Sequence, residues 1–179
     1  MSKPYRVRSF CDFPPGETVE SSLQFVGRPA APRAVAQVRI LAVGSPRWNT
    51  SDGRRPSQRE TDAMITQWNV QPGIFRPLRL AVKKVYAGSV KLGRITAFAE
   101  TGTIGPDEVA SCAFGSSRQL QIREGPAIAT KGSTYVAFLG TELIPGTTGA
   151  ISQPIIADLI VIRGNKVVGY SNRLESFPL

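Results

Sequence analysis

The sequence predicts an all-β domain, a small antiparallel barrel or sandwich with long loops. Its apolar residues alternate with polar ones, or run in short segments bounded by turn residues, which is typical of strands. Gly and Pro contribute 17 and 14 of the 179 residues, which suits a domain with many turns better than a helical one. A hydrophobic fraction of 41% is enough for a core, and the length fits one domain.

Residues 1–33 are expected to form an extended, proline-rich N-terminal arm, followed by a single barrel domain over residues 34–179. Proline discourages helix and supplies no hydrogen-bond donor to a sheet. Apolar side chains could anchor the arm on the domain or on a neighbour. These side chains belong to Phe10, Phe13, Leu23, Phe25 and Val26.

Two stretches give the clearest strand patterns. Residues 34–44 are apolar on both faces, so we expect one face in the core and the other covered by the arm. Residues 75–90 alternate until Lys84, after which Val85 takes the apolar face. One extra residue with a phase slip is the pattern of a β-bulge.

The remaining segments divide into short strands, loops and one ambiguous stretch. Ser57 and Glu60 resemble a capping box for a helical turn near 58–68, yet the apolar residues that follow also suit a strand edge. Gly164-Asn165 predicts a tight hairpin between the last two strands. Strands are expected at 94–100, 134–140, 157–164 and 166–170, and loops rich in Gly, Thr and Pro at 101–117 and 140–154.

The formal net charge is +9, and the whole excess lies in the first 100 residues. A one-sided basic surface attracts nucleic acid, anionic membranes, acidic glycans or acidic proteins. A soluble protein that merely has a high isoelectric point is the simpler alternative. No apolar run approaches the ~20 residues that a membrane span needs.

The composition argues against an enzyme. The chain has no histidine, which excludes a histidine general base and imidazole metal ligands. The adjacent carboxylates Asp107 and Glu108 are interpreted as a solvated turn. We therefore expect no catalytic residues, no metal and no cofactor; a hydrolase with Ser-Lys or carboxylate chemistry is the remote alternative.

Cys11 and Cys112 are the only cysteines, and they lie too far apart in sequence for a redox or metal-binding motif. They are a candidate disulfide that would tie the arm to the barrel. Closing a loop of this length contributes at most about 4–5 kcal/mol in the chain-entropy model. Two separate thiols are the alternative.

The stretch PRWNTSDGRRP, residues 46–56, is the most distinctive in the chain. Asn49 and Asp52 can bond their own backbone and Gly53 permits a positive φ, which predicts a structured turn, such as a hairpin tip centred on Asp52-Gly53. In the structural interpretation, Trp48 packs under the loop. In the functional one, Trp48 with Arg47, Arg54 and Arg55 forms an aromatic and guanidinium patch that binds phosphate, sugar acid or carboxylate. Asn49 and Asp52 are further candidate partner-binding residues.

A second basic row comes from Arg76, Arg79, Lys83 and Lys84. If this strand is half-buried, Arg79 and Lys83 lie on its outer face and join the candidate partner-binding residues. Cationic residues on an outer strand also discourage edge-to-edge aggregation, which is the alternative explanation.

The order of these elements resembles uncharacterised bacterial domains related to the netrin-type OB barrels, which are like tissue inhibitors of metalloproteinases. The resemblance covers roughly residues 34–140. It implies an OB-like barrel of five or six strands in an exported protein. Inhibitors of that group use an N-terminal Cys, whereas this chain begins MSKPYR, so protease inhibition is not implied. The matching residues are Gly44, Trp48, Asn49, Thr50, Asp52, Gly53, Val82, Val85, Gly88, Gly132, Tyr135, Phe138 and Leu139.

These observations lead to two hypotheses of function. The first is a non-enzymatic β-barrel interaction module, such as a structural or accessory subunit, that binds another protein, a second copy of itself or an anionic cell-surface polymer. It expects the arm and the 46–56 loop at an interface. The alternative is a nucleic-acid-binding OB-like domain that uses the Trp48 and arginine surface. The first 25 residues lack the apolar core of a signal peptide, which leaves a cytoplasmic chain or a mature exported one, and the resemblance favours export.

Overall fold

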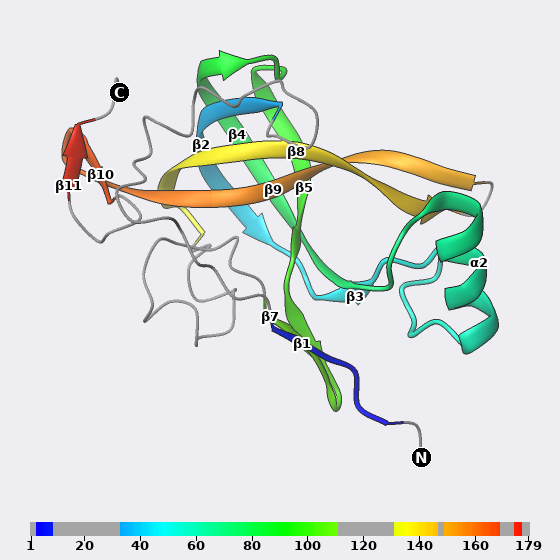
Figure 1. The fold of residues 1–179 in the computed structure, drawn as a ribbon. Helices are drawn as coiled ribbons and strands as arrows, with labels where there is room; N and C mark the ends of the chain where they lie inside the picture. Colours follow the sequence, from blue (N-terminus) through cyan, green and yellow to red (C-terminus); the bar gives the residue numbers. More distant parts are fainter. Residues whose placement is uncertain (1–2, 9–32, 111–130, 147–148, 169–173, 177–179) are drawn as a thin grey trace.

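The computed structural model describes residues 3–8, 33–110, 131–146, 149–168 and 174–176. These residues are mostly β-strand, with one helix, which confirms the expected mainly β class (Figure 1). The elements are β1 (Arg6–Arg8), β2 (Ala34–Val43), β3 (Arg47–Trp48), α2 (Gln58–Trp68), β4 (Ile74–Gly88), β5 (Gly93–Glu100), β6 (Gly102–Ile104), β7 (Asp107–Ala110), β8 (Thr134–Gly146), β9 (Gly149–Arg163), β10 (Lys166–Val168) and β11 (Leu174–Ser176).

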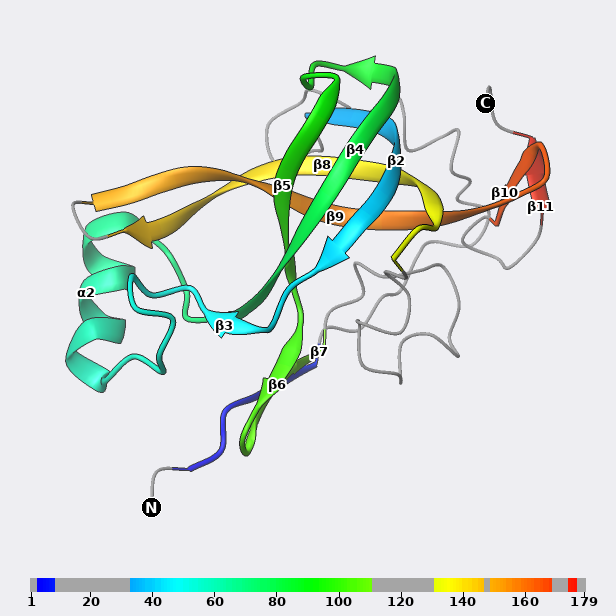
Figure 2. The ribbon, with the colours of Figure 1, turned by 180° about the vertical axis from the view of Figure 1, so that it is seen from behind.

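Five strands close into a ring, in the order β2, β4, β5, β9, β8 and back to β2 (Figures 1 and 2). Four junctions are antiparallel, and the fifth joins β5 to β9 in parallel at Phe98 and Ile155. A ring with an odd number of strands cannot alternate in direction throughout, so one pair must be parallel. The expectation of a purely antiparallel sheet is therefore wrong, and the sheet is mixed.

The phase slip expected in residues 75–90 is a β-bulge in β4. Val82 pairs with Val38 and Lys84 pairs with Gln37, so Lys83 is the extra residue. Beyond the bulge, Val85 is partly buried against the same core cluster as Val82. The bulge therefore keeps apolar side chains on the inner face while it bends the strand around the ring.

The core lies inside the ring. Its large members come from β2, β4, β8 and β9, and alanines fill the positions between them. Small residues beside large ones let the side chains of facing strands interlock without voids. The buried members are Ala34, Ala36, Val38, Ile40, Leu78, Leu80, Val82, Ala97, Ala99, Tyr135, Ala137, Leu139, Ile156 and Leu159.

The other face of β2 is also covered at its start, as its two apolar faces predict. Val35 packs with Val136, Phe138, Ile160 and Val167 in a second cluster. Val167 of β10 supplies part of this cover, and the expected cover by the arm falls on residues 9–32, outside the described residues. The hairpin at Gly164-Asn165 places β10 there, and its pairing with β9 confirms that prediction.

The ambiguous stretch after Ser57 is a helix, α2. The hydroxyl of Ser57 accepts a hydrogen bond from the backbone N–H of Glu60, and the Glu60 carboxylate accepts one from the backbone N–H of Ser57. This reciprocal capping box confirms the helical alternative. The helix ends at Asn69, whose φ of 53° is in the left-handed region that asparagine tolerates.

Both stretches expected to be loops contain strands. Within 101–117, β6 and β7 form a hairpin whose turn includes Gly105, with a φ of 57°. Within 140–154, β8 and β9 continue as a two-stranded ribbon. In both places the Gly and Pro content suggested a loop, although the backbone is paired in strands. Glycine and proline there lie at turns and strand edges. The ribbon extends toward the end of the molecule where α2 lies (Figures 1 and 2).

The described part of the N-terminal arm pairs with the β6–β7 hairpin. β1 pairs in parallel with β7, from Arg6 with Glu108 to Arg8 with Ala110. The strands β1, β7 and β6 form a separate three-stranded sheet. Residues 9–32, with the expected apolar anchors and Cys11, and residues 111–130, with Cys112, are outside the described residues.

Candidate functional site

The 46–56 loop contains β3 and a closed turn that leads from it toward α2. The Gly53 N–H donates to the Thr50 carbonyl over 3.1 Å, and the Trp48 N–H donates to the Gly53 carbonyl over 3.1 Å. Gly53 has the expected positive φ, 75°. The turn is centred on Ser51 and Asp52, and a helix follows it, so the prediction of a hairpin tip at Asp52-Gly53 is wrong. The capping box begins at Ser57, two residues after Arg55, so the chain continues into a helix instead of a returning strand.

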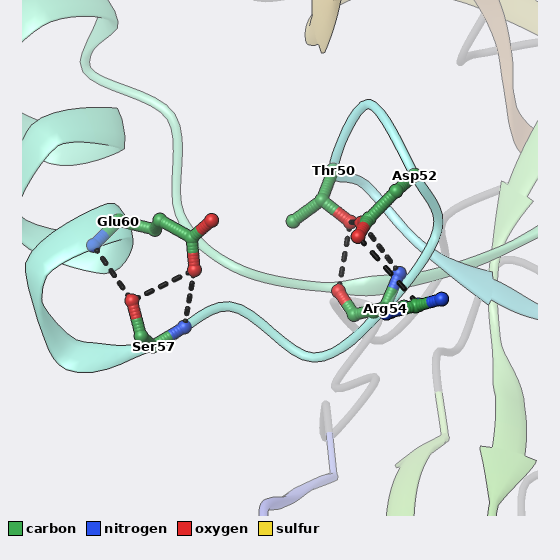
Figure 3. Close-up of polar contacts among 5 residues, drawn as sticks. All are labelled: Thr50, Asp52, Arg54, Ser57 and Glu60. Carbon is green, nitrogen blue, oxygen red and sulfur yellow. Dashed lines mark hydrogen bonds and ion pairs between the residues drawn. The ribbon is translucent and has the colours of Figure 1, made fainter.

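Two side chains stiffen this turn (Figure 3). The Thr50 hydroxyl donates to the Arg54 carbonyl over 2.7 Å. The Asp52 carboxylate accepts from the Arg54 N–H over 3.0 Å, and this hydrogen bond is the main reason that the Asp52 pKa is lowered. The ion pair between Arg54 and Asp52 is exposed and 3.7 Å long, so it contributes little to stability.

Trp48 is buried under the loop, with 2% of its surface exposed. It packs with Ile74 and Val109, and the ring of Tyr5 meets it edge-on at 5.1 Å between centroids. The guanidinium of Arg55 lies 6.0 Å from the ring centre. The indole therefore holds together β3, β4, β7 and the start of the chain, and it is not presented to a ligand.

Asn49 is also buried, and both the nitrogen and the oxygen of its side chain are hydrogen-bonded. Its side-chain amide donates to the Gln71 carbonyl over 2.8 Å and accepts from the Gly73 N–H over 2.9 Å. The residue thereby ties the loop to the segment that leads into β4.

Arg55 joins the loop to β7 and to the start of the chain. It donates to the Asp107 carboxylate over 3.0 Å and to the Lys3 carbonyl over 2.8 Å. Asp107 is only 4% exposed and also accepts from the backbone N–H of Tyr5. The expectation that Asp107 belongs to a solvated turn is therefore wrong, because its charge is compensated by a guanidinium and a backbone donor.

Two ionisable side chains near the Arg55–Asp107 ion pair, Glu100 and Tyr5, have raised pKa values. Glu100 is exposed as a whole, yet its carboxyl end lies against the backbone of Gly73, and the loss of water there raises its pKa. Burial, and then the charge of Glu100, raise the pKa of Tyr5, whose hydroxyl donates to the Pro72 carbonyl.

The outer face of β2, β4 and β5 carries a set of arginines. Arg39 and Arg94 both lie opposite Ala81, one on each neighbouring strand, and Arg79 lies opposite Thr96. All three arginines are exposed. Within the described ranges, no carboxylate is at ion-pair distance from Arg79 or Arg94. We call these three residues and the surface between them the arginine face.

A hollow of about 340 Å³ opens on the arginine face. Arg79 and Arg94 supply guanidinium groups, and Thr96 supplies a hydroxyl. Leu41 supplies an apolar wall, and Ile95, whose side chain packs against the core, also lines the hollow. Leu41 is the extra residue of a second bulge, between Ile40 and Ala42 of β2. Further along the same face, the guanidinium of Arg47 covers Phe98 at 5.4 Å from the ring centre.

The structure separates the expected site residues into three groups. Trp48 and Asn49 are internal, and Arg55 is turned toward Asp107. Asp52 and Arg54 are exposed at the turn, and Lys83 is exposed in the β4 bulge. Arg47 and Arg79 lie on the outer surface next to β5, and Arg79 joins the arginine face.

Sequence reasoning missed Arg39, Arg94, Leu41 and Thr96. The signal was available in part, because RITAFAE alternates Arg94, Thr96 and Phe98 with small or apolar residues. Which strand lies beside this one, and in which register, depends on pairing that a single strand pattern does not give.

No group of three or more metal-ligating side chains is present among the residues that the structure places. No helix there is long and apolar enough to cross a membrane.

Known proteins offer no further guide to this site. Comparisons with protein-family models, curated proteins and solved structures found no match to the chain.

Proposed function

We propose that this protein is a non-enzymatic binding module that recognises an acidic partner, a protein or an anionic polymer, through the arginine face. The observation that carries the proposal is the pair Arg79 and Arg94, exposed on adjacent strands beside a hollow, with no described carboxylate in reach. Unpaired guanidinium groups in a fixed arrangement suit carboxylate, sulfate or phosphate groups, because their donors are planar and forked.

The ring supports the proposal of an OB-like barrel, which the resemblance to netrin-type domains implies. The OB fold is a five-stranded, partly open barrel that binds ligands on the face of its second and third strands. In chain order, the second and third strands of this ring are β4 and β5, which carry Arg79 and Arg94. The segment 44–73 and the β8–β9 ribbon would then correspond to the two loops that flank that face.

The test is a binding titration of the purified chain against labelled poly-L-glutamate and a labelled polyuronate at increasing salt. We expect binding that weakens as salt rises, because screening reduces the attraction between exposed charges. The double variant R79Q/R94Q should lose most of this binding. The matched control is R54Q, which removes one exposed arginine from the 46–56 turn. Failure of both polymers to bind at low salt would contradict the proposed function.

A nucleic-acid-binding domain is the second candidate, because the cationic β4–β5 face is also where OB barrels hold single strands. Such sites add stacking aromatic side chains. Here Trp48, Phe75 and Phe98 are at most 6% exposed, so the described part of the face offers charge without a stacking platform. Oligothymidylate in the same titration decides between the two, since tighter binding than poly-L-glutamate at equal salt would favour nucleic acid.

A further inference from the structure

We infer that the hollow on the arginine face is a subsite for an acidic peptide segment, in which a glutamate or aspartate stands next to an apolar residue. This inference rests on the proposed function and narrows its ligand. It follows from two properties of one hollow: cationic donors at Arg79 and Arg94, and an apolar wall at Leu41.

The cationic donors select a carboxylate. Arg79 and Arg94 come from adjacent strands and flank Thr96, whose hydroxyl can donate a further hydrogen bond. A carboxylate has two oxygens and can accept from several donors together, which strengthens each charge-assisted bond. The two guanidinium groups also gain from a ligand charge, since no described carboxylate neutralises them.

The apolar wall at Leu41 selects a peptide over a sugar or a base. Leu41 is brought to the surface by the β2 bulge and remains partly exposed. An aliphatic side chain beside the carboxylate would remove this surface from water, which favours binding in proportion to the apolar area covered. Sugar rings and bases are held by aromatic faces in such barrels, and the residues lining the hollow include no aromatic.

The hollow and its surroundings suit an extended peptide segment. The volume of about 340 Å³ exceeds that of one carboxylate and leaves room for a neighbouring side chain. Exposed arginines continue on either side, at Arg39 in one direction and Arg47 in the other. Further acidic residues of the same segment can therefore pair outside the hollow.

The experiment compares two short labelled peptides of equal net charge, one with a Leu-Glu pair and one with Gly-Glu in its place. We expect wild type to bind the leucine peptide about fivefold more tightly, since covering part of one leucine gives roughly 1 kcal/mol. Leu41→Ala should abolish this preference and leave the binding of the glycine peptide unchanged. R79Q and R94Q should each weaken both peptides about tenfold, the effect expected of one charge-assisted hydrogen bond.

The outcomes separate the two proposals. If neither peptide nor poly-L-glutamate binds wild type, the proposed function itself fails. If the peptides bind and R79Q and R94Q behave like R54Q, binding does not use the arginine face, and both proposals fail. Equal binding of the two peptides, or binding of the polyuronate alone, would overturn the peptide assignment. Circular dichroism and urea unfolding of every variant show whether the exposed substitutions leave the fold intact.

Discussion

At the scale of single residues, Trp48 is the side chain on which the candidate loop depends. It is buried among Ile74, Val109 and Tyr5, which come from three separate segments of the chain. A tryptophan with such neighbours stabilises the packing of the loop far more than it could contribute to an open binding surface. The effect of removing it should therefore appear in stability.

We expect Trp48→Ala to lower the free energy of unfolding by about 3–5 kcal/mol, because it removes a large buried ring and leaves a cavity. The measurement is urea unfolding followed by circular dichroism. Arg54→Ala is the matched control, since Arg54 is an exposed residue of the same loop, and it should change stability by less than about 0.5 kcal/mol. Similar effects of the two substitutions would mean that Trp48 is not packed as described.

The residue scale also shows why the candidate site was only partly predictable. The residue types of 46–56 correctly predicted a structured turn with a positive φ at Gly53. The contacts of Arg55 with Asp107 and of Tyr5 with Trp48 join positions far apart in the chain, and no local pattern encodes them. The arginine face was likewise only partly foreseen, because Arg39 and Arg94 meet Arg79 through the register of three strands.

At the scale of elements, the capping box decides the structure of the segment after the loop. Without it, the apolar residues after Ser57 could also have suited a strand edge. The Ser57 hydroxyl lies 3.3 Å from the Glu60 N–H, and the Ser57 N–H lies 2.7 Å from the Glu60 carboxylate (Figure 3). These bonds satisfy backbone donors that the first turn of a helix cannot satisfy by itself.

We expect Ser57→Ala to lower the free energy of unfolding by about 1 kcal/mol, the usual effect of losing an N-cap hydroxyl. Urea unfolding at neutral pH measures it. Ser57→Asp is the matched variant, because aspartate also caps helices, and it should retain most of the stability. An alanine variant as stable as wild type would show that the cap contributes nothing to the folded chain.

The same cap predicts a dependence on pH. Hydrogen bonds from the Ser57 N–H, and then from its hydroxyl, lower the pKa of Glu60. A carboxyl whose pKa is lowered on folding stabilises the protein above its unfolded pKa, and this contribution is lost as the pH falls through the folded value. The stability difference between wild type and Glu60→Gln should therefore be largest at neutral pH and shrink in acid. A constant difference in unfolding titrations across the acidic range would contradict this.

Elements with strong local signals were predicted well, and those that depend on pairing were not. The alternation in β4 gave both the strand and its bulge, and Gly164-Asn165 gave the last hairpin. The β6–β7 hairpin and the β8–β9 ribbon were expected to be loops, because their Gly and Pro content weakens the strand pattern while backbone pairing still holds them. The parallel pairs β1–β7 and β5–β9 join distant segments, and no pattern within either strand predicts them.

At the scale of the whole molecule, the junction between β5 and β9 closes the ring with the fewest paired residues in the described part of the chain. The strands β2 and β4 pair along most of their length, whereas β5 and β9 are joined at Phe98 and Ile155 alone among the described residues. Few shared hydrogen bonds mean that local opening there costs little free energy.

We expect backbone amides that face the β5–β9 seam to exchange with solvent at least about tenfold faster than amides between β2 and β4, because local opening is easier where fewer bonds must break. Hydrogen exchange followed by NMR measures both sets in one sample, so the β2–β4 amides are the internal control. Equal protection at the two junctions would mean that the ring opens only when the whole domain unfolds.

The order of strands in the ring also has a consequence for synthesis of the chain. The strands β2, β4 and β5 are complete by Glu100, whereas β8 begins at Thr134 and β9 ends at Arg163. As the chain leaves the ribosome, the first three strands therefore wait with an uncovered apolar face and two unpaired edges. Pairing between distant segments is slow, and exposed edges aggregate. We expect the yield of soluble protein to respond to the rate of translation and to chaperones that hold unfinished chains.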